Sequence, residues 1–182
     1  MFKRRDTSKT LEVDRLRQLI ALGPALVAKL DLDAVLNRLL ETARSVTGAK
    51  YAAIGVLDKQ CRELERFVTH GLSQDQERAI GARPRGRGVL GALITDPRPL
   101  RLTDVTADPR SSGFPAQHPP MRSFLGVPII IRGRAWGNLT EKRTGEFTEA
   151  DEYAATTLAT WAAIAVDHAR LLAGAGKAVG AG

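Results

Sequence analysis

The chain has 182 residues, of which 43% are hydrophobic and 26% charged, so it is long enough for one domain with its own core and unlike a disordered chain. No apolar run approaches the ~20 residues of a membrane-spanning helix, and the first residues lead into no signal-type segment, so we expect a cytoplasmic protein without a membrane partner. The single cysteine, Cys61, excludes an intramolecular disulfide, a cysteine zinc cage and a CxxC redox centre.

Two helices are predicted at the start of the chain. Apolar residues recur at helical spacing from about residue 10 to residue 29, and Gly23-Pro24 should bend or interrupt this helix. A second helix is expected over residues 32–46, because Asp31 is well placed as N-cap and Gly48 follows its end. Residues 1–30 are therefore expected to be a helical extension.

The middle of the chain changes to the period of strands. Residues 51–57 and 62–70 predict the two strands of a hairpin, and Ser73 caps a short helix over residues 73–80. Residues 86–94 read as a loop running into another short helix, followed by a short strand over residues 99–102. The stretch 103–120 has no periodicity, and a loop of this length in a compact domain is usually functional.

The last third predicts a hairpin and a long helix. Residues 123–132 and 134–141 flank Gly133 and are typical of paired strands. Thr148 and Asp151 form a capping box for a helix that ends near Leu172, and the Gly/Ala-rich tail over residues 173–182 is expected to be flexible.

These elements predict an α+β fold over residues 31–172. A central antiparallel sheet of five to six strands carries the N- and C-terminal helices on one face. Loops and short helices of the middle segment cover the other face, where a ligand pocket is expected.

The net charge of +7 raises the question of nucleic-acid binding. The basic residues fall in small groups, with no recognition helix or basic aromatic strand beside them. We therefore expect an arginine-rich surface and no nucleic-acid partner. The groups are Lys3-Arg4-Arg5, Arg83/Arg85/Arg87, Arg98/Arg101, Arg132/Arg134 and Lys142-Arg143.

The order of elements, with Phe124-Leu125-Gly126-Val127-Pro128 and the later Phe147-Thr148-Glu149-Ala150-Asp151, resembles the GAF domain. The run from Gly113 to Pro128, with its His-Pro-Pro-Met, is similar to the haem-binding GAF domains of the actinobacterial dormancy-survival redox and oxygen sensor histidine kinases. This resemblance implies haem b as cofactor and His118 as the proximal ligand of its iron.

The residues around His118 suit that role. Haem requires a neutral imidazole and a flat apolar slot. Pro119 and Pro120 restrict the backbone beside the histidine. The candidates for the apolar walls are Phe114, Met121, Phe124, Phe67, Leu90, Leu93 and Ile94. The other histidines have ordinary interpretations, because His70 ends a strand and His168 lies near the end of a helix.

Two positions depart from the resemblance. The tyrosine-leucine pair that follows Gly-x-Leu in many members is missing after Leu139, so Thr140 would occupy the position of the distal tyrosine. A threonine hydroxyl is shorter, which predicts weak distal hydrogen bonding and poor oxygen binding while CO and NO still bind. Gly55 stands where some members carry a glutamate at the haem edge, which suggests an open path for solvent or electrons; alternatively, the glycine is needed for close packing.

The sequence therefore predicts a haem-based sensor of diatomic gas (O2, CO, NO) or redox state and not an enzyme, because Cys61 has no evident base beside it. A homodimer is expected, in which the first helix and the closing helix, with Leu158, Trp161, Ile164 and Ala165, form a parallel bundle; alternatively, Trp161 only packs against its own sheet. The output is a histidine kinase region in cis or a partner in trans. The alternative is a haem-free GAF module for dimerisation or scaffolding that binds another small ligand or none.

Overall fold

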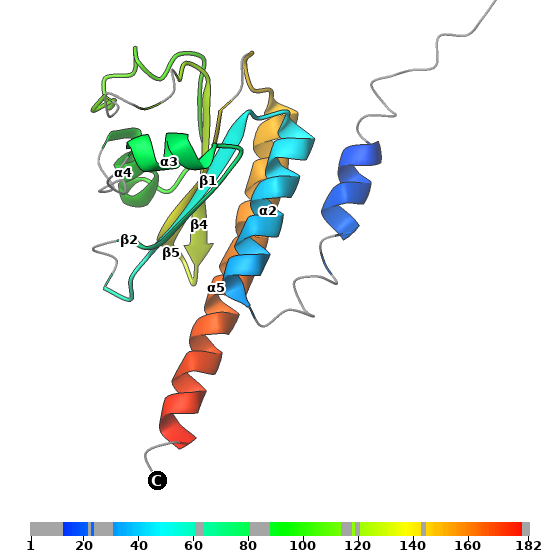
Figure 1. The fold of residues 1–182 in the computed structure, drawn as a ribbon, viewed down its shortest axis with the longest axis vertical. Coiled ribbons are helices and arrows are strands. Elements are labelled where there is room, and N and C mark those ends of the chain that lie inside the picture. Colours follow the sequence, from blue (N-terminus) through cyan, green and yellow to red (C-terminus); the bar gives the residue numbers. More distant parts are fainter. Residues whose placement is uncertain are drawn as a thin grey trace, which may run out of the picture.

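A five-stranded antiparallel sheet forms the centre of the molecule, with the strands in the order β2-β1-β5-β4-β3 (Figure 1). The computed structural model describes residues 13–21, 23, 31–60, 64–80, 88–113, 118, 121–142 and 145–179, and of these only the backbone at 79–80, 137–142 and 173–179. The strands are β1 (Tyr51–Leu57), β2 (Leu64–His70), β3 (Leu100–Leu102), β4 (Phe124–Ile131) and β5 (Arg134–Lys142). The predicted sheet is confirmed.

The helices lie in two layers on opposite faces of this sheet (Figure 1). α2 (Leu32–Thr47) and α5 (Glu149–Val179) pack against one face and against each other. The short helices α3 (Gln74–Ile80) and α4 (Gly88–Thr95) lie over the other face. This arrangement confirms the α+β fold, in which the middle of the chain covers the face that the long helices leave free.

The ends of the long helices follow local sequence signals. Asp31 caps α2 by accepting a hydrogen bond from the backbone N–H of Asp33 at 3.0 Å, and Gly48 ends it in the left-handed conformation with φ 69°. α5 begins with the predicted capping box. The backbone N–H of Asp151 donates to Thr148 Oγ1 at 3.2 Å, and the N–H of Thr148 donates to Asp151 Oδ2 at 2.8 Å.

The main core lies between the sheet and the layer of α2 and α5. Alternate residues of β1 and β4 enter it, because successive side chains of a strand point to opposite faces. The fully buried side chains include Leu36, Leu39 and Leu40 of α2, Ile54 and Val56 of β1, Leu125, Val127 and Ile129 of β4, and Leu158 of α5.

A two-residue turn joins β4 and β5. Ile131 pairs with Arg134, and the residues between them, Arg132 and Gly133, have φ values of 50° and 76°. Two successive positive φ values define the type I′ turn, whose twist matches that of the flanking strands. The predicted hairpin is confirmed, and Arg132 has a backbone conformation that residues other than glycine rarely adopt.

An N-terminal helical segment, residues 13–21, lies beside α2 and α5. Leu19 is buried in the main core, Ser45 Oγ donates to Gln18 Oε1 at 3.1 Å, and Arg15 Nη2 lies 3.1 Å from Asp151 Oδ1. These contacts confirm a helix in this part of the chain. The bend predicted at Pro24 lies outside the described residues, as does Cys61.

Two predictions about α5 need correction. The helix continues past the predicted end near Leu172 to Val179, so residues 173–179 are helical and do not form the predicted flexible tail. The alanines of this stretch favour a helix, and it contains no proline to stop one. Of the four predicted dimer residues only Ile164 is exposed; Leu158 is buried, and Trp161 and Ala165 pack against the main core.

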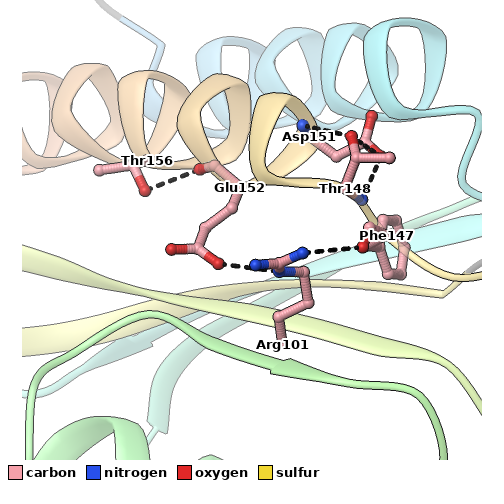
Figure 2. A network of polar contacts seen from close by, with 6 residues as sticks. All are labelled: Arg101, Phe147, Thr148, Asp151, Glu152 and Thr156. Atoms are coloured by element: carbon pink, nitrogen blue, oxygen red, sulfur yellow. Dashed lines mark hydrogen bonds and ion pairs between the residues drawn. The ribbon is translucent and has the colours of Figure 1, made fainter.

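Edge strand β3 is connected to the start of α5 by one arginine (Figure 2). Arg101 Nη1 donates to the carbonyl oxygen of Phe147 at 3.2 Å, and its Nε donates to Glu152 Oε2 at 3.1 Å. The arginine therefore links the sheet both to the segment before α5 and to the first turn of that helix.

None of the helices in the described part of the chain has both the length and the apolar character that a membrane span requires.

Candidate functional site

The sheet face opposite α2 and α5 has a floor of small residues. Ala53 and Gly55 alternate along β1 with residues that enter the main core, and Gly126 lies on β4. In the strand ladders Gly55 lies opposite Phe67 of β2, and the backbone of Thr140 lies opposite both Ala53 and Gly126. Strand β5 thus continues through the predicted distal position, whose side chain lies outside the described atoms.

A second, smaller apolar layer covers this floor. Its buried side chains are Val89, Leu93, Val105 and Phe124, against which Leu90, Leu100, Leu102 and Met121 pack half-buried. The layer brings together four of the residues predicted to line the site, namely Leu90, Leu93, Met121 and Phe124. Two more, Phe67 of β2 and Ile94 of α4, are half-buried on these elements, and Phe114 lies outside the described residues.

His118 is half-buried beside this layer. Its imidazole meets the ring of Tyr51 edge-on, with ring centroids 6.1 Å apart and an angle of 69° between the planes. The hydroxyl of Tyr51 donates in turn to Sδ of Met121 at 3.4 Å. Burial raises the pKa of Tyr51 above its usual value, which keeps the hydroxyl protonated and able to donate. Tyr51 thereby connects His118 to the apolar layer.

Sequence reasoning did not select Tyr51 as a site residue. A signal was present, because Tyr51 begins β1 and alternates with Ala53 and Gly55, the positions expected to face away from the long helices. The other two histidines lie elsewhere. Nδ1 of His70 lies 2.9 Å from Arg44 Nη1 of α2, and His168 is exposed on α5.

The donor chemistry at His118 fits haem, which needs one imidazole ligand and apolar walls. Part of the floor is already covered by protein, however. A Cβ atom on Gly126 would lie 2.6 Å from Leu93 Cδ1 and 2.7 Å from Phe124 Cε1. Among the predicted wall residues, Phe67, Leu90, Ile94 and Met121 are half-buried and keep some exposed surface. A macrocycle would therefore have to contact this second group or displace the Leu93 and Phe124 side chains.

A cavity of about 230 Å³ opens beside the C-terminal end of α4. Leu93 and Leu100 form its apolar wall, and Asp96, Arg98 and Arg110 line it with charge. Its guanidinium groups are paired locally, Arg98 with Asp96 and Arg110 with Asp108, and the Arg110 partner lowers the pKa of Asp108 to about 2. This cavity is smaller than the roughly 300–1,000 Å³ of common ligand pockets and is not lined by His118.

No group of three His, Cys, Asp or Glu side chains comes together as a metal site in the part of the chain that the structure describes. The distinctive feature of this sheet face is thus a single histidine beside apolar side chains. The fold as a whole is an antiparallel sheet with long helices on one face and a layer of loops and short helices on the other.

The chain belongs to the GAF domain family, whose sequence pattern it matches over residues 29–167. Solved structures agree with this assignment. The GAF domain of a phosphoenolpyruvate-protein phosphotransferase from Coxiella burnetii superposes with a TM-score of 0.78 at 24% identity, covering 90% of this chain and 98% of that one.

Two other solved structures have a similar fold. The free methionine-R-sulfoxide reductase of Neisseria meningitidis, solved with its substrate, has a TM-score of 0.72 at 21% identity over 94% of this chain and 97% of that one. A GAF domain/HD domain protein from Geobacter sulfurreducens has a TM-score of 0.67 at 21% identity, over 80% and 98%. At these identities the likeness concerns the fold alone.

Proposed function

We propose that this GAF domain is a haem-binding sensory module in which the imidazole of His118 is the proximal ligand. The observation that carries the proposal is the half-buried ring of His118, held edge-on by Tyr51 beside an apolar layer. The sequence around it, from Gly113 to Pro128, supports the same ligand through its resemblance to haem-binding GAF domains. Bound haem supplies an iron centre that takes up diatomic gases and changes redox state.

If haem binds, the chain would contribute an imidazole nitrogen and an apolar boundary to the site. His118 would hold the iron through one ring nitrogen of its imidazole. Phe67, Leu90 and Ile94 are half-buried apolar side chains whose exposed surface a macrocycle would cover, and that burial favours binding. Thr140 continues β5 at the distal position, so we propose that O2 binds poorly while CO and NO bind.

We propose that strand β3 carries the state of the site to α5. Leu100 and Leu102 of this strand pack against the apolar layer that includes Met121, while Arg101 between them holds Phe147 and Glu152 (Figure 2). A shift of the segment around His118 would therefore reach the start of the output helix through one strand. Ligation biases the helix only if the haem-bound site favours one of its arrangements over another.

We further propose that the output acts through a homodimer. Exposed apolar side chains follow the free side of α5 and of the N-terminal helix, and association would bury them. They are Tyr153, Ile164 and Leu171 on α5, and Val13, Leu16 and Ile20 on residues 13–21. A histidine kinase region or a partner protein would then receive the signal from the paired helices.

The test is the absorption spectrum of the purified protein after incubation with hemin, recorded oxidised, reduced, and reduced with CO. We expect a Soret band that shifts on reduction and on CO binding. His118→Ala should lose it, and His168→Ala, the matched control at an exposed histidine of α5, should keep it. No Soret band in the parent protein, or an unchanged one in His118→Ala, would refute the proposal.

A haem-free dimerisation or scaffold module is the second candidate function. The side chains of Leu93 and Phe124 that already cover Gly126 favour it, because they occupy part of the floor on which a macrocycle would lie. The same spectra decide between the two candidates. A colourless protein that still forms dimers, with weaker self-association in Ile164→Asp, would support this second function.

A further inference from the structure

Tyr51 has two contacts with the part of the chain that contains His118. Its ring and the imidazole of His118 form a T-shaped pair with a centroid distance of 6.1 Å, within the range of favourable aromatic pairs. Its hydroxyl donates to Sδ of Met121 at 3.4 Å, a residue that follows the histidine closely in the chain. One side chain thus contacts both ends of the short segment from residue 118 to residue 121.

The position of Tyr51 is itself fixed by the sheet. The residue begins β1 and pairs with Lys142 of β5, while the next residue, Ala52, pairs with His70 of β2. β1 is therefore held by neighbours on both sides, and its backbone cannot shift independently. Met121 is anchored in a different way, because it packs against the buried layer of α4 and β4. Tyr51 bridges a rigid strand and a loop.

We propose that Tyr51 is the positioning residue for His118, with its ring restricting the orientation of the imidazole and its hydroxyl fixing Met121 beside it. The role toward haem rests on the proposed function, whereas the contact itself is a property of the chain. An aromatic ring beside a histidine limits the rotation of the imidazole before any ligand arrives. Less conformational freedom is then lost when the nitrogen binds a metal centre, so the complex is retained longer.

The first test uses the haem-free protein labelled at its three histidines. The resonances of His118 are assigned by their disappearance in His118→Ala. We expect nuclear Overhauser contacts between the ring protons of Tyr51 and His118 in the parent protein. Tyr51→Leu should shift the His118 ring resonances, because the ring current is lost, whereas Tyr51→Phe should leave them close to their original positions. Tyr153→Leu, at the only other tyrosine, is the control on an exposed site.

The second test uses the haem-loaded protein and measures the rate at which haem passes to a scavenging apoprotein. Loss of an aromatic contact in Tyr51→Leu should speed release roughly two- to tenfold. Tyr51→Phe keeps the ring but loses the hydrogen bond to Met121, so its release rate should lie between those of the parent and Tyr51→Leu. A purely structural role of the tyrosine would not predict this partial rescue together with the His118 shift.

The outcomes separate this inference from the proposed function. No haem uptake by the parent refutes the function and the role of Tyr51 toward haem, and leaves the Tyr51–His118 contact to be decided by the resonances alone. Absent Overhauser contacts, or His118 resonances that stay unchanged in Tyr51→Leu, refute the inference even if haem binds. Haem release at the parent rate in Tyr51→Leu likewise refutes it. The Overhauser measurement needs no variant of Tyr51 and so remains decisive if Tyr51→Leu does not fold.

Discussion

Gly126 offers the sharpest test of how the smaller apolar layer is packed. It lies on β4 within the segment that resembles the GAF family, and its missing side chain leaves room for two neighbours. A Cβ there would lie 2.6 Å from Leu93 Cδ1 and 2.7 and 2.8 Å from Phe124 Cε1 and Cζ. Both neighbours are only 1% exposed, so neither can swing into solvent. Gly126→Ala therefore forces a buried layer to shift.

The expected cost follows from two opposing effects. Overpacking a well-filled layer by one methyl group costs about 1–3 kcal/mol. Replacing glycine also restricts the unfolded chain, which stabilises the folded state by about 0.4–1 kcal/mol. The net free energy of unfolding should therefore fall by about 1–2 kcal/mol. Gly145→Ala is a matched control, because a Cβ at Gly145 meets nothing within 4 Å and should show only the second effect.

The assay is urea denaturation of the parent, both alanine variants, Leu93→Ala and the Gly126→Ala/Leu93→Ala double variant. Gly145→Ala should be unchanged or slightly stabilised, and Gly126→Ala should lie about 1–3 kcal/mol below it. Leu93→Ala removes the atom that the new Cβ meets, so the double variant should be less destabilised than the sum of the single variants. Equal stability of the two glycine variants, or strict additivity in the pair, would refute this packing.

Three other predictions concern stability. Gly71→Ala should lower stability toward denaturant clearly more than Gly133→Ala. Both glycines have a positive φ, but only at Gly71 would a Cβ press against its neighbours, Arg44 Nε at 2.6 Å among them. Equal losses of stability would contradict this packing. Arg101→Gln should lower stability by about 1 kcal/mol and speed amide exchange in the first turn of α5, while Arg98→Gln, whose side chain is 79% exposed, leaves both unchanged. The pKa of Asp108 is lowered to about 2, so the contribution of this carboxylate to stability is present above pH 4 and is lost as the pH falls toward 2. Asp108→Asn should therefore flatten that part of the acid unfolding curve. A curve of unchanged slope would contradict this prediction.

Local signals predicted most of the elements correctly. The capping residues Asp31 and Thr148 each satisfy backbone groups within a few residues, so the boundaries they predict do not depend on the rest of the fold. The short helix α3 follows the same rule, with the N–H of Gln76 donating to Ser73 Oγ at 3.2 Å. The turn at Gly133 is likewise local. The end of α5 lies later than the predicted end near Leu172, because the alanines between the glycines favour a helix.

The candidate site could be predicted only in part. The sequence motif points to His118, and four of the residues predicted to line the site, Leu90, Leu93, Met121 and Phe124, form one layer. Their grouping follows from composition, because apolar residues of the middle segment have only one sheet face left to cover. Tyr51 is separated from His118 by 67 residues of chain, so nothing in the neighbourhood of either residue in the sequence indicates that they meet.

The sequence by itself determined where helices and strands begin, which residues are apolar, and that a histidine stands in a long loop. These properties depend on backbone groups and side chains close together in the chain. Tertiary structure alone decided that Tyr51 lies against the imidazole, that Leu93 and Phe124 cover Gly126, and that Arg101 reaches α5. Such contacts depend on strand register and on how the two layers close over the sheet, where a shift of one residue would turn each side chain to the opposite face.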